Sequence, residues 1–461
     1  MNVVARQILD SYGNPTIETD IILESGAFGR NAIAILPNHD STNPLEGCAK
    51  DSSVIGDIVS KNITTINTLL KKRLVGFNAE DQRLFDSTLI NDLVPELEHP
   101  VFSRRSAFSL SLACAKAAAS HLEKPLFSYL MNDDDYIMPV PMISVVRGST
   151  FSGVRDYVND IMIMPVNFTK FSDALFCGVK IFHALEASRF DSLLLSNNNF
   201  FSNSKNILSH LVDAIENTGY RPGRDVYIAL RANSDKLYTN GCYSLSQNAS
   251  ENIAHQELVS YWQKLISSYP IISIEDPMAS QDIEGWKLLT SAIGKKVQLV
   301  GNNIFSTNTK KLKEGINLRF SNSILINPAQ TGTLTSTLQT MSMAAEAGYT
   351  CIISSLKDNT SVALSDLSVA TGSGQIQAGS ICYSSCVQQY NQLLRIEEDL
   401  QDHAIYPGIK TFNFSTDLES NSKHQSSIKT TKNTKNLKAN QSEKKEDNRV
   451  VKSTEQKNIM L

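Results

Sequence analysis

Alternating apolar and polar residues open the chain and predict a pair of strands. Residues 3–9 (VVARQIL) and 16–23 (TIETDIIL) carry the alternation, and the turn-forming residues 11–15 (SYGNP) separate them. Helical patterns follow, among them 106–124 (SAFSLSLACAKAAASHLEK), whose small residues are typical of a helix that packs closely against a neighbour rather than binding a ligand. Residues 1–130 are therefore predicted to form an α+β domain.

After the linker that follows this domain, the pattern changes to short apolar runs separated by amphipathic helical stretches such as 204–219 (SKNILSHLVDAIENTG). Alternating strands and helices favour parallel pairing, and this many units within residues 135–414 favour a closed β/α barrel over an open sheet. Active sites of such barrels lie at the C-terminal ends of the strands. The apolar runs are 161–166 (IMIMPV), 226–230 (VYIAL), 271–275 (IISIE), 297–301 (VQLVG), 324–327 (ILIN) and 351–355 (CIISS).

From residue 415 the composition changes to Ser, Lys, Asn, Gln and Glu, with ten Lys/Arg against six Asp/Glu. Such a segment cannot bury enough apolar surface to fold alone, so residues 415–461 are predicted to be a disordered polar and basic tail. A weak contact of this tail with RNA or with an acidic partner is the alternative hypothesis.

The composition of the whole chain, 41% hydrophobic and 20% charged, is typical of a soluble globular protein. A net charge of -4 gives no electrostatic footprint for nucleic acid over the whole molecule. No run of about 18 apolar residues predicts a membrane span, and the N-terminus lacks a signal-peptide pattern, so we expect a cytoplasmic protein. The seven cysteines are scattered without CxxC spacing, which predicts reduced thiols rather than disulfides or a zinc site.

Several long stretches resemble the enolase family, in its bacterial form, over roughly residues 3–410. They are collinear and span both predicted domains: 5–18 (ARQILDSYGNPTIE), 138–143 (MPVPMI), 273–277 (SIEDP), 297–301 (VQLVG), 303–316 (NIFSTNTKKLKEGI), 330–335 (QTGTLT), 346–350 (EAGYT), 370–376 (ATGSGQI) and 390–400 (YNQLLRIEEDL). The resemblance implies an N-terminal α+β domain followed by a (β/α)8 TIM-like barrel, and a homodimer. It also implies the Mg²⁺-dependent interconversion of 2-phosphoglycerate and phosphoenolpyruvate.

The resemblance implies three acidic ligands for the main magnesium ion, of which this chain keeps one. Glu275 is retained, whereas Arg231 and Asn302 stand where the family has aspartates. Magnesium prefers carboxylate oxygens, and a guanidinium stays protonated and repels the cation. We therefore expect no cofactor, with Mg²⁺ bound only if activity is retained.

Proton-transfer positions implied by the resemblance are substituted as well. Asn327 replaces the lysine base and Gln377 a second lysine, and an amide has no useful basicity. Asp160 keeps an acid on a shorter side chain than the family's glutamate. The other family positions are Asn197 for a catalytic glutamate, Phe151 and Ser355 for histidines, Leu356 for an arginine, and Ser41 and Lys357 as further candidates for substrate binding.

These substitutions favour a catalytically inactive pseudoenzyme with a binding or regulatory role, as a homodimer or as a heterodimer with an active enolase. The alternative within this hypothesis is a duplicate without any selected role. A competing hypothesis retains phosphopyruvate hydratase activity, or a related reaction that uses Asp160, Glu275, Lys357 and Asp358. Nucleic-acid binding through the tail is the third hypothesis.

The substitution at position 231 also predicts a contact. Neighbouring strand ends of the barrel point at one place, so the Arg231 guanidinium is expected to replace the metal ion and to pair with Glu275, because a buried carboxylate without a countercharge is costly. Asn302 is expected to accept one of the remaining guanidinium hydrogens.

Overall fold

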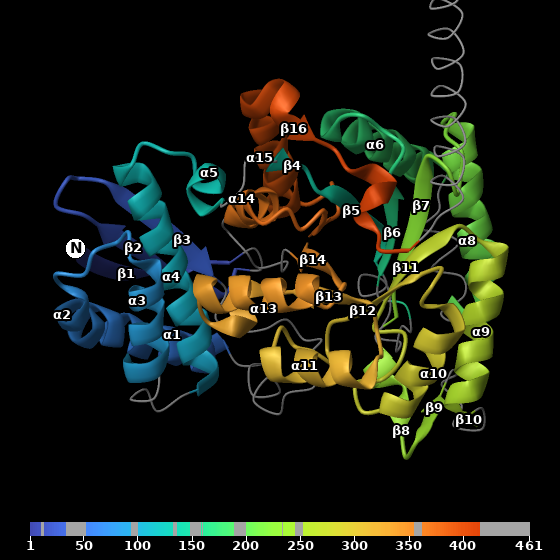
Figure 1. Ribbon diagram of the computed structural model, residues 1–461, viewed down its shortest axis with the longest axis horizontal. Coiled ribbons are helices and arrows are strands. Elements are labelled where there is room, and N and C mark those ends of the chain that lie inside the picture. Colours follow the sequence, from blue (N-terminus) through green and yellow to red (C-terminus); the bar gives the residue numbers. More distant parts are fainter. Residues whose placement is uncertain are drawn as a thin grey trace, which may run out of the picture. The chain divides into compact units, whose positions relative to one another are not determined.

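The computed structural model describes residues 1–10, 13–33, 52–93, 100–131, 136–147, 158, 160–188, 200–232, 234–244, 252–354 and 362–414 (Figure 1). The predicted disorder of residues 415–461 falls outside these residues. The strands β1 (Asn2–Leu9), β2 (Pro15–Ile22) and β3 (Phe28–Ile33) form an antiparallel sheet in the order β1-β2-β3. The predicted first pair of strands is thus confirmed.

The remainder of this α+β part is helical. Its elements are α1 (Ser52–Thr65), the π-helical turn η2 (Ile66–Leu70), α2 (Lys71–Leu74), α3 (Gln82–Thr88), a second π-helical turn η3 (Leu89–Leu93), α4 (Pro100–His121) and α5 (Leu126–Leu130). The helix α4 lies against the sheet (Figure 1).

Close packing of α4, predicted from its small residues, is confirmed at Gly29. A Cβ atom added to Gly29 in β3 would lie 2.0 Å from the Ala113 carbonyl oxygen and 2.4 Å from the Ala117 nitrogen. The backbones of strand and helix therefore approach each other so closely that only glycine fits at this position.

Eight strands close into a barrel in the order β11-β12-β13-β14-β15-β5-β6-β7. They are β5 (Val140–Arg147), β6 (Asp160–Pro165), β7 (Val226–Arg231), β11 (Ile271–Glu275), β12 (Gln298–Gly301), β13 (Ser323–Ile326), β14 (Thr350–Ser354) and β15 (Gln375–Gly379). The predicted barrel is confirmed, and each of the six predicted runs overlaps one strand.

The direction of one strand departs from the prediction of parallel pairing. β6 is antiparallel to both of its neighbours, β5 and β7, while the other neighbouring pairs of the barrel are parallel. An apolar run indicates that a strand is buried but does not indicate its direction. The sequence pattern therefore could not predict that β6 is antiparallel to its neighbours. As a result, the first residue of β6, Asp160, lies at the barrel end where the parallel strands finish.

Helices surround the barrel strands (Figure 1). They are α6 (Phe171–Ala187), α8 (Phe200–Asn217), α9 (His255–Ser268), α10 (Ile283–Ile293), α11 (Thr309–Leu318), α12 (Pro328–Thr331), α13 (Leu334–Glu346), α14 (Ala363–Ala370) and α15 (Ser384–Leu400). The amphipathic stretch 204–219 is confirmed as the main part of α8.

Short elements complete the described chain. They are β4 (Tyr136–Ile137), the 3-10 turn η6 (Ser234–Lys236), the strands β8 (Tyr238–Thr239), β9 (Cys242–Ser244) and β10 (Asn252–Ile253), the turn η7 (Gln401–His403), β16 (Ala404–Ile405) and the turn η8 (Gly408–Thr411).

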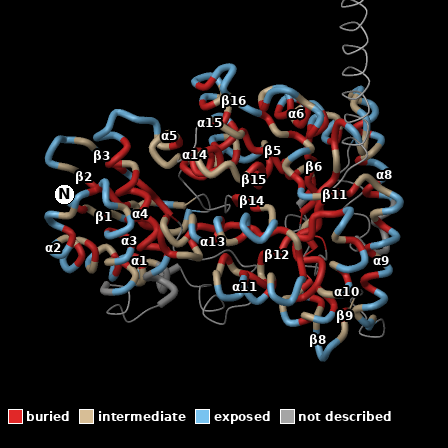
Figure 2. The backbone as a smooth tube through the Cα atoms, in the orientation of Figure 1, coloured by how far each residue is buried: buried red, intermediate tan, exposed pale blue. Residues whose placement is uncertain are grey.

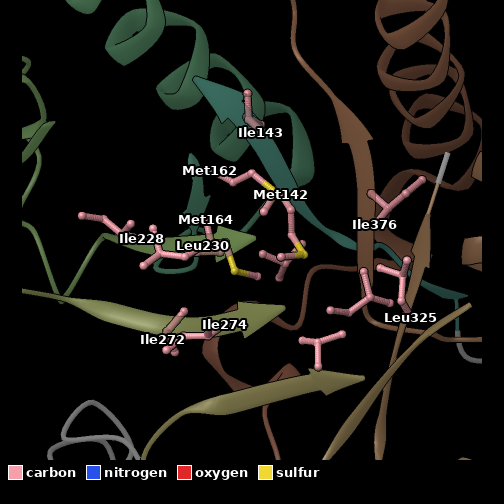
Figure 3. Close-up of a cluster of buried hydrophobic side chains, with 14 of the residues drawn as sticks. Met142, Ile143, Met162, Met164, Ile228, Leu230, Ile272, Ile274, Leu325 and Ile376 are labelled. Atoms are coloured by element: carbon pink, nitrogen blue, oxygen red, sulfur yellow. The ribbon is translucent and has the colours of Figure 1, made fainter. Parts of the chain in front are cut away.

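The largest apolar core lies in and around the barrel. Its strands are buried along their length, while the surrounding helices expose their outer faces (Figure 2). Figure 3 shows Met142, Met162 and Met164 from β5 and β6 gathered with side chains from β7 and β11. Burial of this apolar surface is the main source of stability for the barrel.

A polar layer interrupts the apolar interior. Gln298 and Gln375 exchange two amide hydrogen bonds of 2.9 Å, Gln298 also donates to the Ser273 hydroxyl, and the Thr350 hydroxyl donates to Gln298. Because each of these buried groups has a partner, the layer avoids the cost of unpaired polar atoms.

Hydrogen bonds at the start of α13 join the barrel to the α+β part. The backbone N–H and the hydroxyl of Thr335 both donate to the Asp86 carboxylate, and the Leu334 N–H donates to the Ser111 hydroxyl. These groups satisfy N–H groups that the first turn of a helix leaves unpaired. Burial raises the pKa of Asp86, and the hydrogen bonds from Ser111 and Thr335 oppose that rise.

No helix among the described residues is both long and apolar enough to cross a membrane. Six of the seven cysteines lie in the described ranges, and all six have free thiols. Burial raises the pKa of the Cys351 thiol to about 12, which keeps that group protonated at neutral pH.

Candidate functional site at the C-terminal end of the barrel

Glu275 is the last residue of β11 and is 1% exposed. It pairs in register with Arg231, the last residue of β7, and its sequence neighbour Asp276 begins the loop that follows the strand. Side chains along a strand alternate between its two faces. Because Ser273 belongs to the interior polar layer, Glu275, two residues later, also faces the barrel interior.

Three side chains from other strand ends contact the Glu275 carboxylate. Arg231 Nε lies 3.1 Å from Oε1, Asn302 Nδ2 donates to Oε1 over 2.9 Å, and Gln377 Nε2 donates to Oε2 over 2.9 Å. We call these four residues the Glu275 cluster. The predicted pair of Arg231 and Glu275 is present in this structure.

Asn302 makes a contact that the sequence did not predict. Its amide nitrogen donates to Glu275, while the expected acceptance of a guanidinium hydrogen by Asn302 stays a prediction. A carboxylate is the stronger acceptor, and hydrogen bonds to an ionised group are shorter and stronger than those between neutral groups. Sequence reasoning also missed the contact of Gln377 with Glu275, although a side-chain amide always carries two donors that such a carboxylate can use.

Further contacts fix the orientation of Gln377. The Ser354 hydroxyl donates to Gln377 Oε1 over 3.1 Å, and Nε2 also lies 3.3 Å from the Met162 sulfur. Since Oε1 accepts a hydrogen, the nitrogen end of the amide is directed at Glu275. Gln377 therefore joins β14, β15 and β11 through its side chain.

Asp160 faces Arg231 from the other side. The two residues are partners in the antiparallel pairing of β6 with β7, and Asp160 is buried. Directly opposed residues on neighbouring strands have Cβ atoms about 5 Å apart. Arg231 is therefore flanked by two acidic residues, one on β6 and one on β11.

Asn327, which the resemblance aligns with a lysine base, has a local structural role. It is the N-cap of α12, where its Oδ1 accepts the Ala329 N–H over 3.2 Å ahead of Pro328 at the helix start. Its own N–H donates to the Thr307 hydroxyl over 2.9 Å. Asparagine is a favoured N-cap and proline is favoured in the first turn, which explains how these two residues form this loop.

Asp276 was not identified from the sequence, although it belongs to the retained stretch SIEDP. Its carboxylate accepts the N–H groups of Asn302 and Asn303 over 2.9 and 3.2 Å, and its φ angle is +46°. Burial, followed by the nearby Glu275, raises the pKa of Asp276 well above its usual range. A positive φ is uncommon for a residue with a side chain and often marks a functional loop.

The donor set of the Glu275 cluster does not fit a divalent cation. It offers one carboxylate, two amides and a guanidinium, whereas magnesium requires several oxygen ligands and is repelled by a fixed positive charge. Among the described residues, no group of three or more His, Cys, Asp or Glu side chains is placed to hold a metal ion.

The remaining candidate residues lie outside the described residues. They are Ser41, Phe151, Asn197, Ser355, Leu356, Lys357 and Asp358.

The fold and the site together define a class: an α+β part followed by a β/α barrel, with one reversed strand and polar residues gathered at the strand ends. Residues 1–130 match the model of the enolase N-terminal domain, and residues 135–415 match that of the enolase C-terminal TIM barrel domain. The chain therefore belongs to the enolase family.

Proposed function

We propose that this chain is a non-catalytic enolase homologue, a pseudoenzyme whose scaffold acts as a binding or regulatory partner. The supporting observation is that the one retained metal-ligand carboxylate, Glu275, is engaged by Arg231, Asn302 and Gln377. Each of these three residues replaces a charged residue that the family uses for its metal ion or its enolate.

The magnitudes of the missing contributions support this proposal. Abstraction of a proton beside a carboxylate requires cationic charge at the carboxylate, a base at the carbon and an acid for the leaving group. A general acid or base contributes roughly 10² to 10⁴ in rate, and enzymes typically accelerate reactions by at least about 10⁶. Contributions of groups that act together are not additive, but the loss of an acid, a base or a metal ligand each lowers the rate.

The test of inactivity is a coupled assay with 2-phosphoglycerate and Mg²⁺ on the purified full chain. We expect no dehydration of 2-phosphoglycerate above the rate measured without protein. A purified active enolase, assayed under the same conditions, serves as the positive control. A turnover of about 1 s⁻¹ or more, an ordinary value for enzymes, would overturn the proposal and favour a retained lyase.

We also propose that the chain acts as a dimeric partner in the cytoplasm, a role that its family membership supports. We propose residues 1–130 and 135–414 as its two folded domains. Affinity purification of the full chain from its native cell tests the role. Recovery of an active enolase supports a heterodimer, and recovery of second copies alone supports a homodimer. If neither is recovered, the partner role is wrong and a duplicate without a selected role is favoured.

A further inference from the structure

Five basic residues lie at the end of the barrel opposite the Glu275 cluster. Lys295 and Lys296 precede β12, Arg319 precedes β13 and Arg224 precedes β7, while Lys410 belongs to η8. The strands β7, β11, β12 and β13 are parallel to one another. Their starts therefore share one end of the barrel, and the Glu275 cluster lies at the other. We call these five residues the basal patch.

Hydrogen bonds of Asn322 bring two of these loops together. Its Nδ2 donates over 2.8 and 3.0 Å to two carbonyl groups of residues 294–297, the loop that carries Lys295 and Lys296. Asn322 itself lies three residues after Arg319, in the loop that enters β13. The cations of these two loops are thus held on neighbouring segments of one surface.

The turn η8 connects the same surface with the loop that enters β7. Asn413, just after η8, donates from Nδ2 to the Asn322 carbonyl over 3.3 Å. At the start of η8, a Cβ atom added to Gly408 would lie 2.1 Å from the Val166 carbonyl oxygen. The Val166 N–H in turn donates to the carbonyl of the residue that follows Arg224. The lysine of η8 therefore lies between the two outer loops of the patch.

The side chains of the basal patch have no counterions within the described part of the chain. All five are exposed, and none forms an ion pair or a side-chain hydrogen bond with any residue that the structure describes. In contrast, Arg221 of the same β7 loop is paired with Asp225 over 2.7 Å. Residues 294–297, 319–322 and 347–349 include no acidic residue. The net charge of -4 for the whole chain thus conceals a local positive excess.

Unpaired cations on an exposed surface suit phosphate groups that repeat along a chain. No ion pair within the fold has to break for them to bind, and their contact with a nucleic acid releases its condensed counterions. Aromatic residues of the nearby loops are already engaged in the fold. Tyr220 packs edge-on against Phe168, and the Tyr349 hydroxyl donates to the Phe320 carbonyl over 2.7 Å. Stacking of bases on aromatic rings is therefore not expected to contribute.

A lipid surface suits the basal patch less well. Proteins that lie on anionic membranes combine basic residues with apolar side chains that enter the bilayer boundary. Of the exposed large apolar residues in the described ranges, Leu318 alone adjoins a residue of the patch in sequence. The patch therefore offers charge with little apolar surface.

We propose that the basal patch binds the phosphodiester backbone of single-stranded nucleic acid without reading its sequence. The inference goes beyond the proposed lack of catalysis and beyond pairing with an enolase subunit, because it concerns another face and another class of partner. It also differs from binding through residues 415–461, since the five cations belong to the folded unit of residues 1–414.

The test measures binding of the full chain to fluorescein-labelled poly(U) and poly(dT) of about 20 nucleotides by fluorescence anisotropy, over about 50 to 300 mM NaCl. A dissociation constant of about 10⁻⁵ M or tighter is expected near the low end of this range, with affinity falling steeply as salt is added. Both homopolymers are expected to bind, because phosphate contacts carry no sequence information. Binding of one homopolymer without the other would contradict recognition of the backbone.

The decisive variant combines Lys295→Gln, Lys296→Gln and Arg319→Gln. Each phosphate contact on a single strand contributes about 0.7 to the slope of the logarithm of affinity against that of salt concentration. The slope is therefore expected to become shallower by about 2, and the affinity at about 100 mM NaCl to fall at least about tenfold. Because these exposed side chains have no partners in the described fold, the melting temperature is expected to match that of the wild type.

A matched variant removes the same charge from the other end of α11. Lys310→Gln, Lys311→Gln and Lys313→Gln also neutralise three exposed cations, but they lie near the start of that helix, whereas Arg319 follows its end. At 1.5 Å per residue the two ends are about 15 Å apart. This control is expected to change the affinity by less than about threefold and the slope by less than about 0.5.

A second variant covers the case in which the first is unstable. Arg224→Gln with Lys410→Gln neutralises the other two cations of the patch, and the slope is expected to become shallower by about 1.4. All variants retain residues 415–461, so any binding by that segment is the same in each.

Four results would overturn the proposal. The full chain binds neither homopolymer; both patch variants bind like the wild type; the matched control weakens binding as much as the decisive variant; or the chain binds phosphatidylserine vesicles but no homopolymer. None of these results depends on the lyase assay, because the basal patch and the Glu275 cluster lie at opposite ends of the barrel. A chain without lyase activity can therefore still fail this test, and an active one can pass it.

Discussion

Single residues at the barrel end have local structural roles. Asn327, which the resemblance aligns with a lysine base, caps α12 and binds Thr307 through its backbone. Thr307 has a φ angle of +49°, which is unusual for a β-branched residue, and its hydroxyl also donates to Gln330 over 3.0 Å. These hydrogen bonds hold the strained loop in place.

We therefore expect Asn327→Lys to cost stability without restoring activity. Loss of an N-cap side chain typically costs about 1 kcal/mol, and the metal-ligand positions 231 and 302 would still lack carboxylates. Urea unfolding measures the first effect, and the coupled assay measures the second. Asn327→Ser keeps a capping hydroxyl and serves as the control, which should be closer to wild type. A lysine variant that is fully stable and turns over 2-phosphoglycerate would contradict both parts.

A second prediction for a single residue concerns how the stability of the fold falls at acidic pH. Hydrogen bonds from Arg221, followed by one from Asn167, lower the pKa of Asp225 to about 2. A carboxyl whose folded pKa lies below its ordinary value of about 3.9 contributes stability above that value, and the contribution is lost as the pH falls toward 2. Arg221 is 55% exposed, so solvent screening reduces the contribution to about 1 kcal/mol.

Asp225→Asn is accordingly expected to be about 1 kcal/mol less stable than wild type at pH 6. The difference between the two should shrink as the pH is lowered through 3 toward 2. Chemical unfolding at a series of pH values measures it. A difference that stays constant over this range would mean that the ionised form of Asp225 is not what stabilises the fold.

At the scale of elements, periodicity predicted the positions of strands and helices better than their directions. The apolar runs 226–230 and 271–275 coincide closely with β7 and β11. The run 161–166 also coincides with β6, but its reversal was not predicted, because residues buried on both faces give no sign of direction. Strand direction depends on the connection and on the closure of the whole barrel.

The close contact between β3 and α4 predicts that Gly29 cannot be replaced without a loss of stability. Gly29→Ala should destabilise the chain by about 1–3 kcal/mol or more, because its Cβ would overlap the backbone of α4 at Ala113 and Ala117. Gly56→Ala in α1 is the matched control, since no atom lies within 4 Å of its added Cβ. Alanine is favoured over glycine in a helix, so that variant should be more stable by about 0.5–1 kcal/mol. Urea unfolding of both variants tests the contrast, and equal effects would refute it.

For the whole molecule, the sequence predicted the family and the barrel, and it named the positions that form the Glu275 cluster. It could not give the contacts of Asn302 and Gln377 with Glu275. These residues lie far apart along the chain, and barrel closure brings them together. Which end of an amide faces a carboxylate then depends on its other partners, such as Ser354 for Gln377.

The boundary at residue 414 supplies the last prediction. Residues 1–414 form one compact unit that includes the buried Phe412. Residues 415–461 have few core-forming side chains, so deletion of that segment is expected to change the free energy of unfolding by no more than about 0.5 kcal/mol. Limited proteolysis should also remove it first.

A longer deletion provides the control for this prediction. Removal of residues 408–461 also takes away η8 and Phe412, a residue that is 5% exposed and packs with the barrel core. Loss of a buried aromatic side chain typically costs about 3–5 kcal/mol, so the two truncations should differ clearly in urea unfolding. If the shorter deletion alone costs more than about 1 kcal/mol, residues 415–461 dock on the folded unit and the predicted disorder is wrong.

A mobility-shift assay tests the alternative role of the tail. If the full chain binds RNA and the chain without residues 415–461 does not, the tail has the nucleic-acid role that its basic composition suggests.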